Sequence, residues 1–276
     1  MDHFLSRQYT ALDQPEVTRL LFHPRQDITP TPASCIDQPI PVADGVTLGA
    51  RFHICEDANA VNILFFHGNG EVASDYDQVG VMYRDMGMNF LVIDYRGYGN
   101  SSGEPTVSTM IQDAHVVLDF VKEWLQAHRK TGKLAVMGRS LGSACAIELA
   151  AVRNTEIDGL IIESGFANTV PLMHCLGINA ESLDITEENG FGNRRKIAGF
   201  TKPTFILHAM NDQLIAIGEA NELQADCAAR SKELQMVPGA DHNTIMEVGG
   251  VVYFEVIKNF TGKLGQPERR KRAGVR

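Results

Sequence analysis

The chain has 276 residues and a mass of 30.3 kDa, which fits one α/β domain of ordinary size. Its composition, 44% hydrophobic and 21% charged, excludes disordered, collagenous and coiled-coil proteins. The net charge of −9 makes nucleic acid an unfavourable partner. No apolar stretch approaches the roughly 18 residues that span a bilayer, so we expect no integral membrane segment. The first residues show no signal-peptide pattern.

Two further features concern the tail and the cysteines. The segment 266–276 carries Arg269, Arg270, Lys271, Arg272 and Arg276, and we interpret it as a solvated basic tail, with weak contact to an anionic surface as the alternative. The five cysteines are odd in number and none has C-x-x-C spacing, so we expect neither a disulfide framework nor a metal site. A reducing, cytoplasmic location fits this pattern best.

The N-terminal part predicts an arm and then an antiparallel start. Residues 1–43 are rich in proline and predict an extended arm. Apolar and polar residues alternate from 46 to 54, which indicates a strand with one buried face. The Asp44-Gly45 pair before it is typical of a hairpin turn.

Beyond residue 60, apolar runs alternate with segments of helical length. The runs are 62–66, 90–94, 133–137, 159–162, 204–207 and 233–237. Apolar residues recur with helical spacing over 107–128, and a shorter helix is predicted over 251–257. This alternation predicts a parallel sheet covered by helices on both faces. The interval 165–200 is long for a simple crossover, and we interpret it as a small lid or cap.

The chemistry is expected where the strands end, because ligands bind beyond the carboxyl ends of parallel strands. Residues 138–142, Gly-Arg-Ser-Leu-Gly, match G-x-S-x-G, in which a sharp strand-to-helix turn exposes a serine nucleophile. A second match surrounds Ser101, but it lies several residues after its strand and is followed by Pro105. Ser140 is therefore the predicted nucleophile.

A serine nucleophile needs a general base and a carboxylate that orients it. His242 lies in a loop after the last predicted strand and is the predicted base, whereas His174 falls in the cap and His208 ends a strand. Asp212, in the loop after the 204–207 run, is the predicted acid. Glu163, at the end of the preceding strand, is the competing carboxylate.

The order Ser…Asp…His, preceded by His67-Gly68-Asn69-Gly70, resembles the α/β-hydrolase superfamily. The segment 94–103, Asp-Tyr-Arg-Gly-Tyr-Gly-Asn-Ser-Ser-Gly, is similar to the branch that holds serine-aminopeptidase-like hydrolases and depalmitoylases. The resemblance covers about residues 45–262 and implies one α/β-hydrolase domain with a mostly parallel eight-stranded sheet.

The resemblance also implies roles for individual residues. Ser140, Asp212 and His242 would form the catalytic triad, and the backbone N–H groups of Asn69 and Leu141 would form the oxyanion hole. His67 would brace the loop that carries Asn69. Asp94 and Arg96 are expected to form a structural ion pair with each other.

The predicted function is a cofactor-free serine hydrolase that cleaves esters or thioesters through an acyl-enzyme. A serine peptidase of the aminopeptidase type is the alternative, with cap acids such as Glu181, Asp184, Glu187 and Glu188 as anchors for an amine. A non-catalytic binding protein on the same fold is a second alternative. Because the cap has few large apolar residues, we expect a small-molecule substrate with a short to medium acyl chain.

Overall fold

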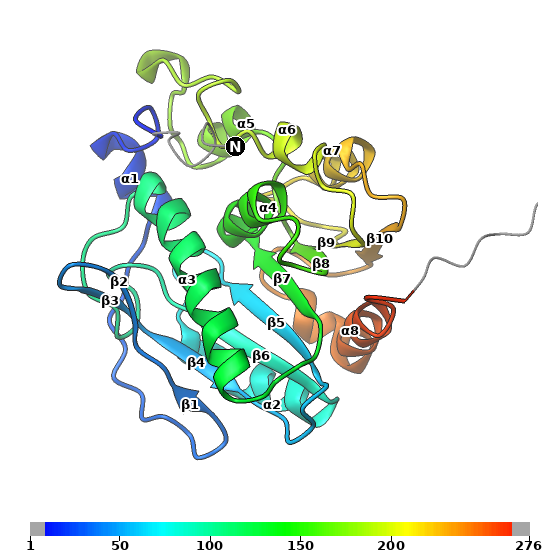
Figure 1. Cartoon of the computed structure of the whole chain (residues 1–276). Coiled ribbons are helices and arrows are strands. Elements are labelled where there is room, and N and C mark those ends of the chain that lie inside the picture. Colours follow the sequence, from blue (N-terminus) through cyan, green and yellow to red (C-terminus); the bar gives the residue numbers. More distant parts are fainter. Residues whose placement is uncertain (1–8, 267–276) are drawn as a thin grey trace, which may run out of the picture.

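The computed structural model describes residues 9–266, and the segment 267–276 that contains the basic residues of the predicted tail lies outside them. Its centre is an eight-stranded sheet with the order β1-β4-β6-β5-β7-β8-β9-β10 (Figure 1). The antiparallel strands at one edge are β1 (Ile36–Asp37) and β4 (Ala50–His53). The parallel strands are β5 (Val61–Phe66), β6 (Met88–Ile93), β7 (Leu134–Arg139), β8 (Gly159–Glu163), β9 (Thr204–Ala209) and β10 (Lys232–Val237). The predicted α/β-hydrolase sheet with an antiparallel start is confirmed.

Helices cover both faces of this sheet. One face packs against α3 (Val107–Ala127), α4 (Ser143–Val152) and α7 (Ile217–Asp226), and the other against α2 (Asp77–Asp85) and α8 (Ile245–Thr261). Successive strand residues therefore enter different core clusters: Leu64 and Phe66 enter the first, and Ile63 and Phe65 the second. This division explains why the strands appear in the sequence as continuous apolar runs.

Helix α3 matches the predicted helix closely. It begins after Thr106, whose hydroxyl accepts a hydrogen bond from the Thr109 N–H at 3.1 Å, as an N-cap should. Helix α8 is longer than the predicted 251–257 and bends at Gly250, where φ is 50°. Helix α2 lies between β5 and β6, in one of the segments of helical length.

The prediction for residues 46–54 needs correction. Gly49 separates β3 (Val46–Leu48) from β4, and β3 pairs with β2 (Ile40–Ala43) in a hairpin of its own, through a turn at Gly45 with φ 72°. All four residues of β4 are buried, because α3 and α2 cover its two faces. The hairpin turn is where the sequence predicted it, but the single half-buried strand is wrong.

The predicted extended arm also needs correction. Residues 15–21 form helix α1 (Pro15–Leu21), with proline in the first turn, where its missing N–H costs nothing. Tyr9, Leu12, Val17 and Leu21 are buried in the main core cluster. Residues 9–22 are therefore an integral part of the folded body.

Residues 165–200, which we interpreted from the sequence as a small lid or cap, lie between β8 and β9. They contain α5 (Thr169–Cys175), a 3₁₀ turn (Glu181–Leu183) and α6 (Asn193–Ile197). In Figure 1 this region lies near α1, above the carboxyl ends of the strands. The other two 3₁₀ turns are Ala73–Tyr76 and Ser140–Gly142.

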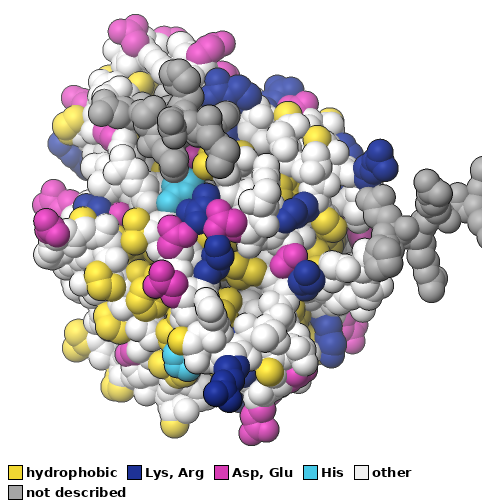
Figure 2. Space-filling model, in the orientation of Figure 1, with side chains coloured by type: hydrophobic (Ala, Val, Ile, Leu, Met, Phe, Trp, Pro, Cys, Tyr) yellow, Lys and Arg dark blue, Asp and Glu magenta, His cyan; other side chains and the backbone are white. Residues whose placement is uncertain are grey.

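On the face shown in Figure 2, acidic and basic side chains are interspersed. Among residues 9–266, no helix is both long and apolar enough to cross a bilayer.

Candidate active site

Ser140 lies at the sharp turn between β7 and α4. Its φ is 50°, a left-handed conformation that residues with a side chain rarely adopt. The two motif glycines permit the turn: a Cβ on Gly138 would lie 2.3 Å from the Gly142 carbonyl oxygen, and one on Gly142 would lie 2.1 Å from that of Phe66. Any larger residue at these positions would open the turn, so the glycines fix the strand-to-helix geometry around Ser140.

Ser140, His242 and Asp212 form a continuous hydrogen-bonded chain. The His242 Nε2 lies 2.9 Å from the Ser140 Oγ, and the His242 Nδ1 lies 2.7 Å from the Asp212 Oδ2. Asp212 follows β9, and His242 lies in the loop between β10 and α8. The fold thus brings together three residues that are up to 102 positions apart in the sequence.

The Asp212 carboxylate is held from two directions. Its Oδ1 accepts hydrogen bonds from the N–H groups of Leu214 and Ile215, at 3.0 and 2.8 Å. Burial alone would raise the pKa of Asp212, but the hydrogen bonds from His242 and Ile215 outweigh it and hold this pKa below its usual value. Asp212 is therefore ionised at neutral pH and fixes the orientation of the His242 ring.

The competing residues have other contacts. Glu163 is fully buried, accepts a hydrogen bond from the Tyr253 hydroxyl and lies 3.6 Å from Arg139. His208 contacts the Ile215 carbonyl at 2.8 Å, and His174 pairs with Glu181 on the exposed side of the cap. The Ser101 hydroxyl accepts the Gly49 N–H at 2.8 Å.

The two predicted oxyanion residues, Asn69 and Leu141, line the same cavity as Ser140 and His242. The Asn69 Oδ1 accepts hydrogen bonds from the His23 N–H and the Tyr98 hydroxyl, both at 2.8 Å. Its side chain is thus engaged with neighbouring segments, and the oxyanion role of its backbone N–H stays a prediction.

His67 lies directly before this loop and is fully buried. Its Nδ1 is 2.8 Å from the Gly68 carbonyl oxygen, and its Nε2 is 3.3 Å from Asp94. These contacts agree with the bracing role that the resemblance implied.

The expected Asp94–Arg96 ion pair is wrong. Arg96 forms a two-pronged ion pair with Asp113 of α3, at 2.7 and 2.8 Å, whereas Asp94 accepts the Ala73 N–H at 2.8 Å. The two residues follow β6 in a loop with Gly97 at φ 75°, so their side chains reach different elements. The pairing partners come from helices and loops that the local sequence does not indicate.

The sequence analysis missed an ion pair between the buried Arg139 and the half-buried Glu71. The Arg139 Nε lies 2.8 Å from the Glu71 Oε1, and the Arg139 Nη1 donates to the His242 carbonyl oxygen at 3.0 Å. The Glu71 Oε2 accepts the Gly68 N–H and the Tyr76 hydroxyl, both at 2.6 Å. The pair therefore connects the loops that carry Asn69 and His242 to the residue before the nucleophile.

The charge on this pair is well defined. Burial would raise the pKa of Glu71, but the Arg139 charge and the hydrogen bonds keep it below its usual value, so the carboxylate is ionised at neutral pH. The sequence holds one signal that could have indicated this pair, namely the positions of its members. Glu71 directly follows the His-Gly-Asn-Gly segment, and Arg139 directly precedes Ser140.

The site opens into a cavity of about 250 Å³. Its apolar walls come from α1, from α5 and the residue that follows it, and from the loop after Asp212. The apolar side chains on these walls are Leu21, Leu172, Leu176, Leu214 and Ile215. A neighbouring cavity of about 340 Å³ shares Leu172, Cys175, Leu214 and Ile215 with it. Among residues 9–266, the one group of three metal-ligating side chains lies elsewhere, at Cys35, His53 and Asp77.

Comparison with known proteins finds relatives in the α/β-hydrolase superfamily. The model of the serine aminopeptidase family S33 matches residues 57–182. The α/β-hydrolase domain-containing protein WAV2 of Arabidopsis thaliana is 28% identical over 83% of this chain and 79% of its own length. The lysophosphatidylserine lipase ABHD12 of Rattus norvegicus is 28% identical over 78% of this chain and 60% of its own length.

The fold agrees with these matches. The esterase Pf2001 of Pyrococcus furiosus superposes with a TM-score of 0.69 and 19% identity, covering 88% of this chain and 99% of its own. The chain therefore belongs to the α/β-hydrolase superfamily, and its relatives place it among hydrolases.

Proposed function

We propose that this protein is a serine hydrolase that cleaves carboxylic esters or thioesters through an acyl-enzyme. The observation that carries the proposal is the hydrogen-bonded chain Ser140–His242–Asp212 on the wall of an apolar cavity. A serine alcohol is a weak nucleophile, and a base at hydrogen-bonding distance is what activates it.

The proposed reaction has two halves. His242 takes the Ser140 proton as the Oγ attacks the acyl carbon, and the resulting oxyanion accepts hydrogen bonds from the N–H groups of Asn69 and Leu141. The protonated His242 then gives its proton to the leaving alcohol or thiol. Water, activated by the same imidazole, attacks the acyl-enzyme and releases the acid, which restores Ser140.

The cavity favours an acyl substrate over a peptide. The acids proposed to anchor an amine are engaged elsewhere: Glu187 caps the start of α5 through the Thr169 and Val170 N–H groups, and Glu181 pairs with His174. Glu71 is the one acidic residue among the described residues that line the cavity, and it forms an ion pair with Arg139. The rat relative is named as a lipase, a class that cleaves acyl esters, which also supports this choice.

The acyl chain is proposed to be short to medium. The cavity beside Ser140 is bounded by Leu172 and Leu176 of the cap, so the cap limits the length of chain that fits. The neighbouring cavity behind Leu172 is the direction in which a longer chain would extend.

The first test is covalent labelling. Wild-type protein should react with a fluorophosphonate, and mass spectrometry should place the adduct on Ser140, whereas Ser140→Ala should remain unlabelled. Labelling that is absent from a folded wild-type protein would favour the non-catalytic binding protein.

The second test is a substrate series. p-Nitrophenyl esters from acetate to palmitate should be hydrolysed with a maximum at short to medium length, while aminoacyl amides should not be cleaved. Faster cleavage of the amides would favour the peptidase, and a maximum at palmitate would overturn the proposed chain length.

A further inference from the structure

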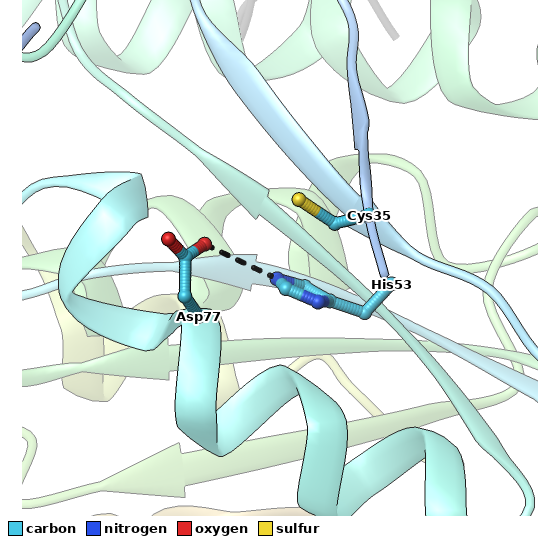
Figure 3. A group of neighbouring side chains, drawn as sticks. All are labelled: Cys35, His53 and Asp77. Carbon is cyan, nitrogen blue, oxygen red and sulfur yellow. Dashed lines mark ion pairs between the residues drawn. The ribbon is translucent and has the colours of Figure 1, made fainter. Parts of the chain in front are cut away.

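Away from the active site, three side chains with metal-ligand chemistry converge beside β4. Cys35 directly precedes β1, His53 ends β4, and Asp77 is the first residue of α2. Because Ile36 pairs with Phe52 in the antiparallel register, Cys35 lies across from His53. Figure 3 shows the three side chains directed toward a common space, and their candidate ligand atoms all lie within 4.8 Å of one another.

The polar atoms in this space lack partners. His53 is fully buried, and neither of its ring nitrogens has a hydrogen bond among the described residues. The Asp77 Oδ1 is also buried without a hydrogen-bond partner there, and it lies 3.9 Å from the His53 Nε2. Buried polar groups are normally paired, and leaving one unpaired costs about 1–3 kcal/mol. Such a cluster has the chemistry of a ligand site.

The fold makes room for the imidazole at this place. A Cβ on Gly80 of α2 would lie 2.2 Å from the His53 Cδ2, so the absence of a side chain at Gly80 lets the ring pack against the helix.

The neighbouring charges suit a divalent cation. Arg51 pairs with the Asp77 Oδ2 and lies 3.3 Å from Asp37, which leaves the Asp77 Oδ1 directed at His53. When a cation binds, the Cys35 thiol would release its proton into solvent and ligate as the thiolate. The carboxylates of Asp37 and Asp77 and the Cys35 thiolate would then carry three negative charges. These balance the positive charge of Arg51 and the +2 charge of the cation.

We propose that Cys35, His53 and Asp77 bind a borderline-soft divalent cation, represented by Zn²⁺, in a structural site that joins β1, β4 and α2. Thiolate sulfur, imidazole nitrogen and carboxylate oxygen are the three ligand types that zinc takes in proteins, and solvent completes a tetrahedral set. The site lies at the β1 edge of the sheet, and it does not depend on the proposed hydrolase activity. These ligands come from three separate segments, so no C-x-x-C spacing marks the site in the sequence.

Cobalt provides a direct test, because Co²⁺ bound to a thiolate has a charge-transfer absorption in the near ultraviolet. The full chain, freed of metal with a chelator, should bind one equivalent of Co²⁺ with this absorption, and Zn²⁺ should abolish it by displacement. Zn²⁺ should also raise the melting temperature of the protein, because it binds the folded state.

Variants identify the ligands. Cys35→Ser and Cys35→Ala should both lose the charge-transfer band, whereas Cys55→Ser, at another half-buried cysteine, should retain it. Asp77→Asn should keep the band but weaken Co²⁺ binding by more than about tenfold. Two cysteine variants are measured so that misfolding of one, detected by circular dichroism, leaves the test intact. No band in the wild-type protein, or a band that survives in a folded Cys35 variant, would overturn the proposal; a water bridging His53 and Asp77 would then explain the cluster.

Discussion

At the residue scale, the left-handed backbone of Ser140 is the strained feature of the site. A non-glycine residue at φ 50° costs on the order of 1–3 kcal/mol, which the surrounding packing must supply. This strained conformation positions the Ser140 Oγ in the turn before α4, 2.9 Å from the His242 Nε2.

The triad gives the first prediction. Ser140→Ala and His242→Ala should each lower kcat by about 10⁵–10⁶-fold, because the members act as a unit. Asp212→Asn should cost roughly 10⁴-fold, since it disturbs the His242 tautomer but leaves the nucleophile and base. Glu163→Gln should lower kcat by less than about tenfold, because the Glu163 carboxylate is hydrogen-bonded to Tyr253 and not to His242. Steady-state hydrolysis of a p-nitrophenyl ester measures all four; a damaging Glu163→Gln beside a mild Asp212→Asn would show that the wrong acid was chosen.

The second prediction concerns Glu71. Glu71→Gln should lower kcat by up to about 10²-fold with little change in KM, because Arg139 would no longer hold the Asn69 and His242 loops in register. The exposed Glu104→Gln is the matched control and should have wild-type kinetics. A Glu71→Gln enzyme with unchanged kcat and an unchanged rate of fluorophosphonate labelling would exclude a positioning role for this pair.

The third prediction separates the backbone of the oxyanion loop from its side chain. Gly68→Val should lower kcat by about 10²–10³-fold, because a Cβ there would lie 3.0 Å from the Glu71 Oε2, which Tyr76 and the Gly68 N–H already hold in place. Asn69→Ala keeps the N–H and should cost under about tenfold. Both variants are compared at equal melting temperature; equal damage from the two would mean that the Asn69 side chain takes part.

At the scale of elements, a buried ion pair joins the cap to the body. The Lys196 Nζ of α6 lies 2.7 Å from the Glu148 Oε2 of α4, and His115 of α3 lies 3.5 Å from the same carboxylate. Lys196 also donates to the Tyr9 hydroxyl at 2.8 Å. One carboxylate thus links α3, α4, α6 and the N-terminal segment.

The fourth prediction follows from this pair. Glu148→Gln should lower the free energy of unfolding by about 3–5 kcal/mol at pH 7, because it leaves the buried Lys196 charge without its carboxylate. Burial would raise the pKa of Glu148, but His115 and Lys196 outweigh it and lower this pKa to about 2, from an ordinary value of 4.5. The wild-type advantage is therefore complete above about pH 4.5 and declines as the pH falls toward 2.

Urea unfolding at several pH values measures this difference. The exposed Glu123→Gln on α3 is the control and should match the wild-type protein throughout. A stability difference that stays constant from pH 7 to pH 3 would contradict the role of the Glu148 charge.

At the scale of the whole molecule, residues 9–22 form part of the main core cluster. Tyr9, Leu12, Val17, Leu21 and Phe22 are each at most 4% exposed and belong to the main core cluster. Leu21 also lines the cavity beside Ser140. Stability and the site therefore depend on the same segment.

The fifth prediction is that deletion of residues 1–22 prevents stable folding. Each buried apolar side chain contributes about 1.5–3 kcal/mol, so five together approach the whole stability of a typical domain, about 5–15 kcal/mol. The deletion variant should be insoluble or lack a cooperative melting transition. Deletion of residues 267–276, interpreted from the sequence as a solvated tail, is the comparison; a cooperative transition at the wild-type temperature after the N-terminal deletion would contradict the prediction.

The sequence by itself determined the alternation of strands and helices, the sharp turn at Ser140 and the order of the candidate triad. These features are local: hydrophobic periodicity decides the elements, and Gly138 and Gly142 are needed wherever this turn forms. Only the tertiary structure decided which distant groups meet, namely Arg96 with Asp113, Glu71 with Arg139, and Cys35 with His53 and Asp77. The reason is physical: a charged or metal-ligating side chain takes its partner from whatever the packed elements place within a few ångströms, and neither its own position nor its neighbours in the chain encode that partner.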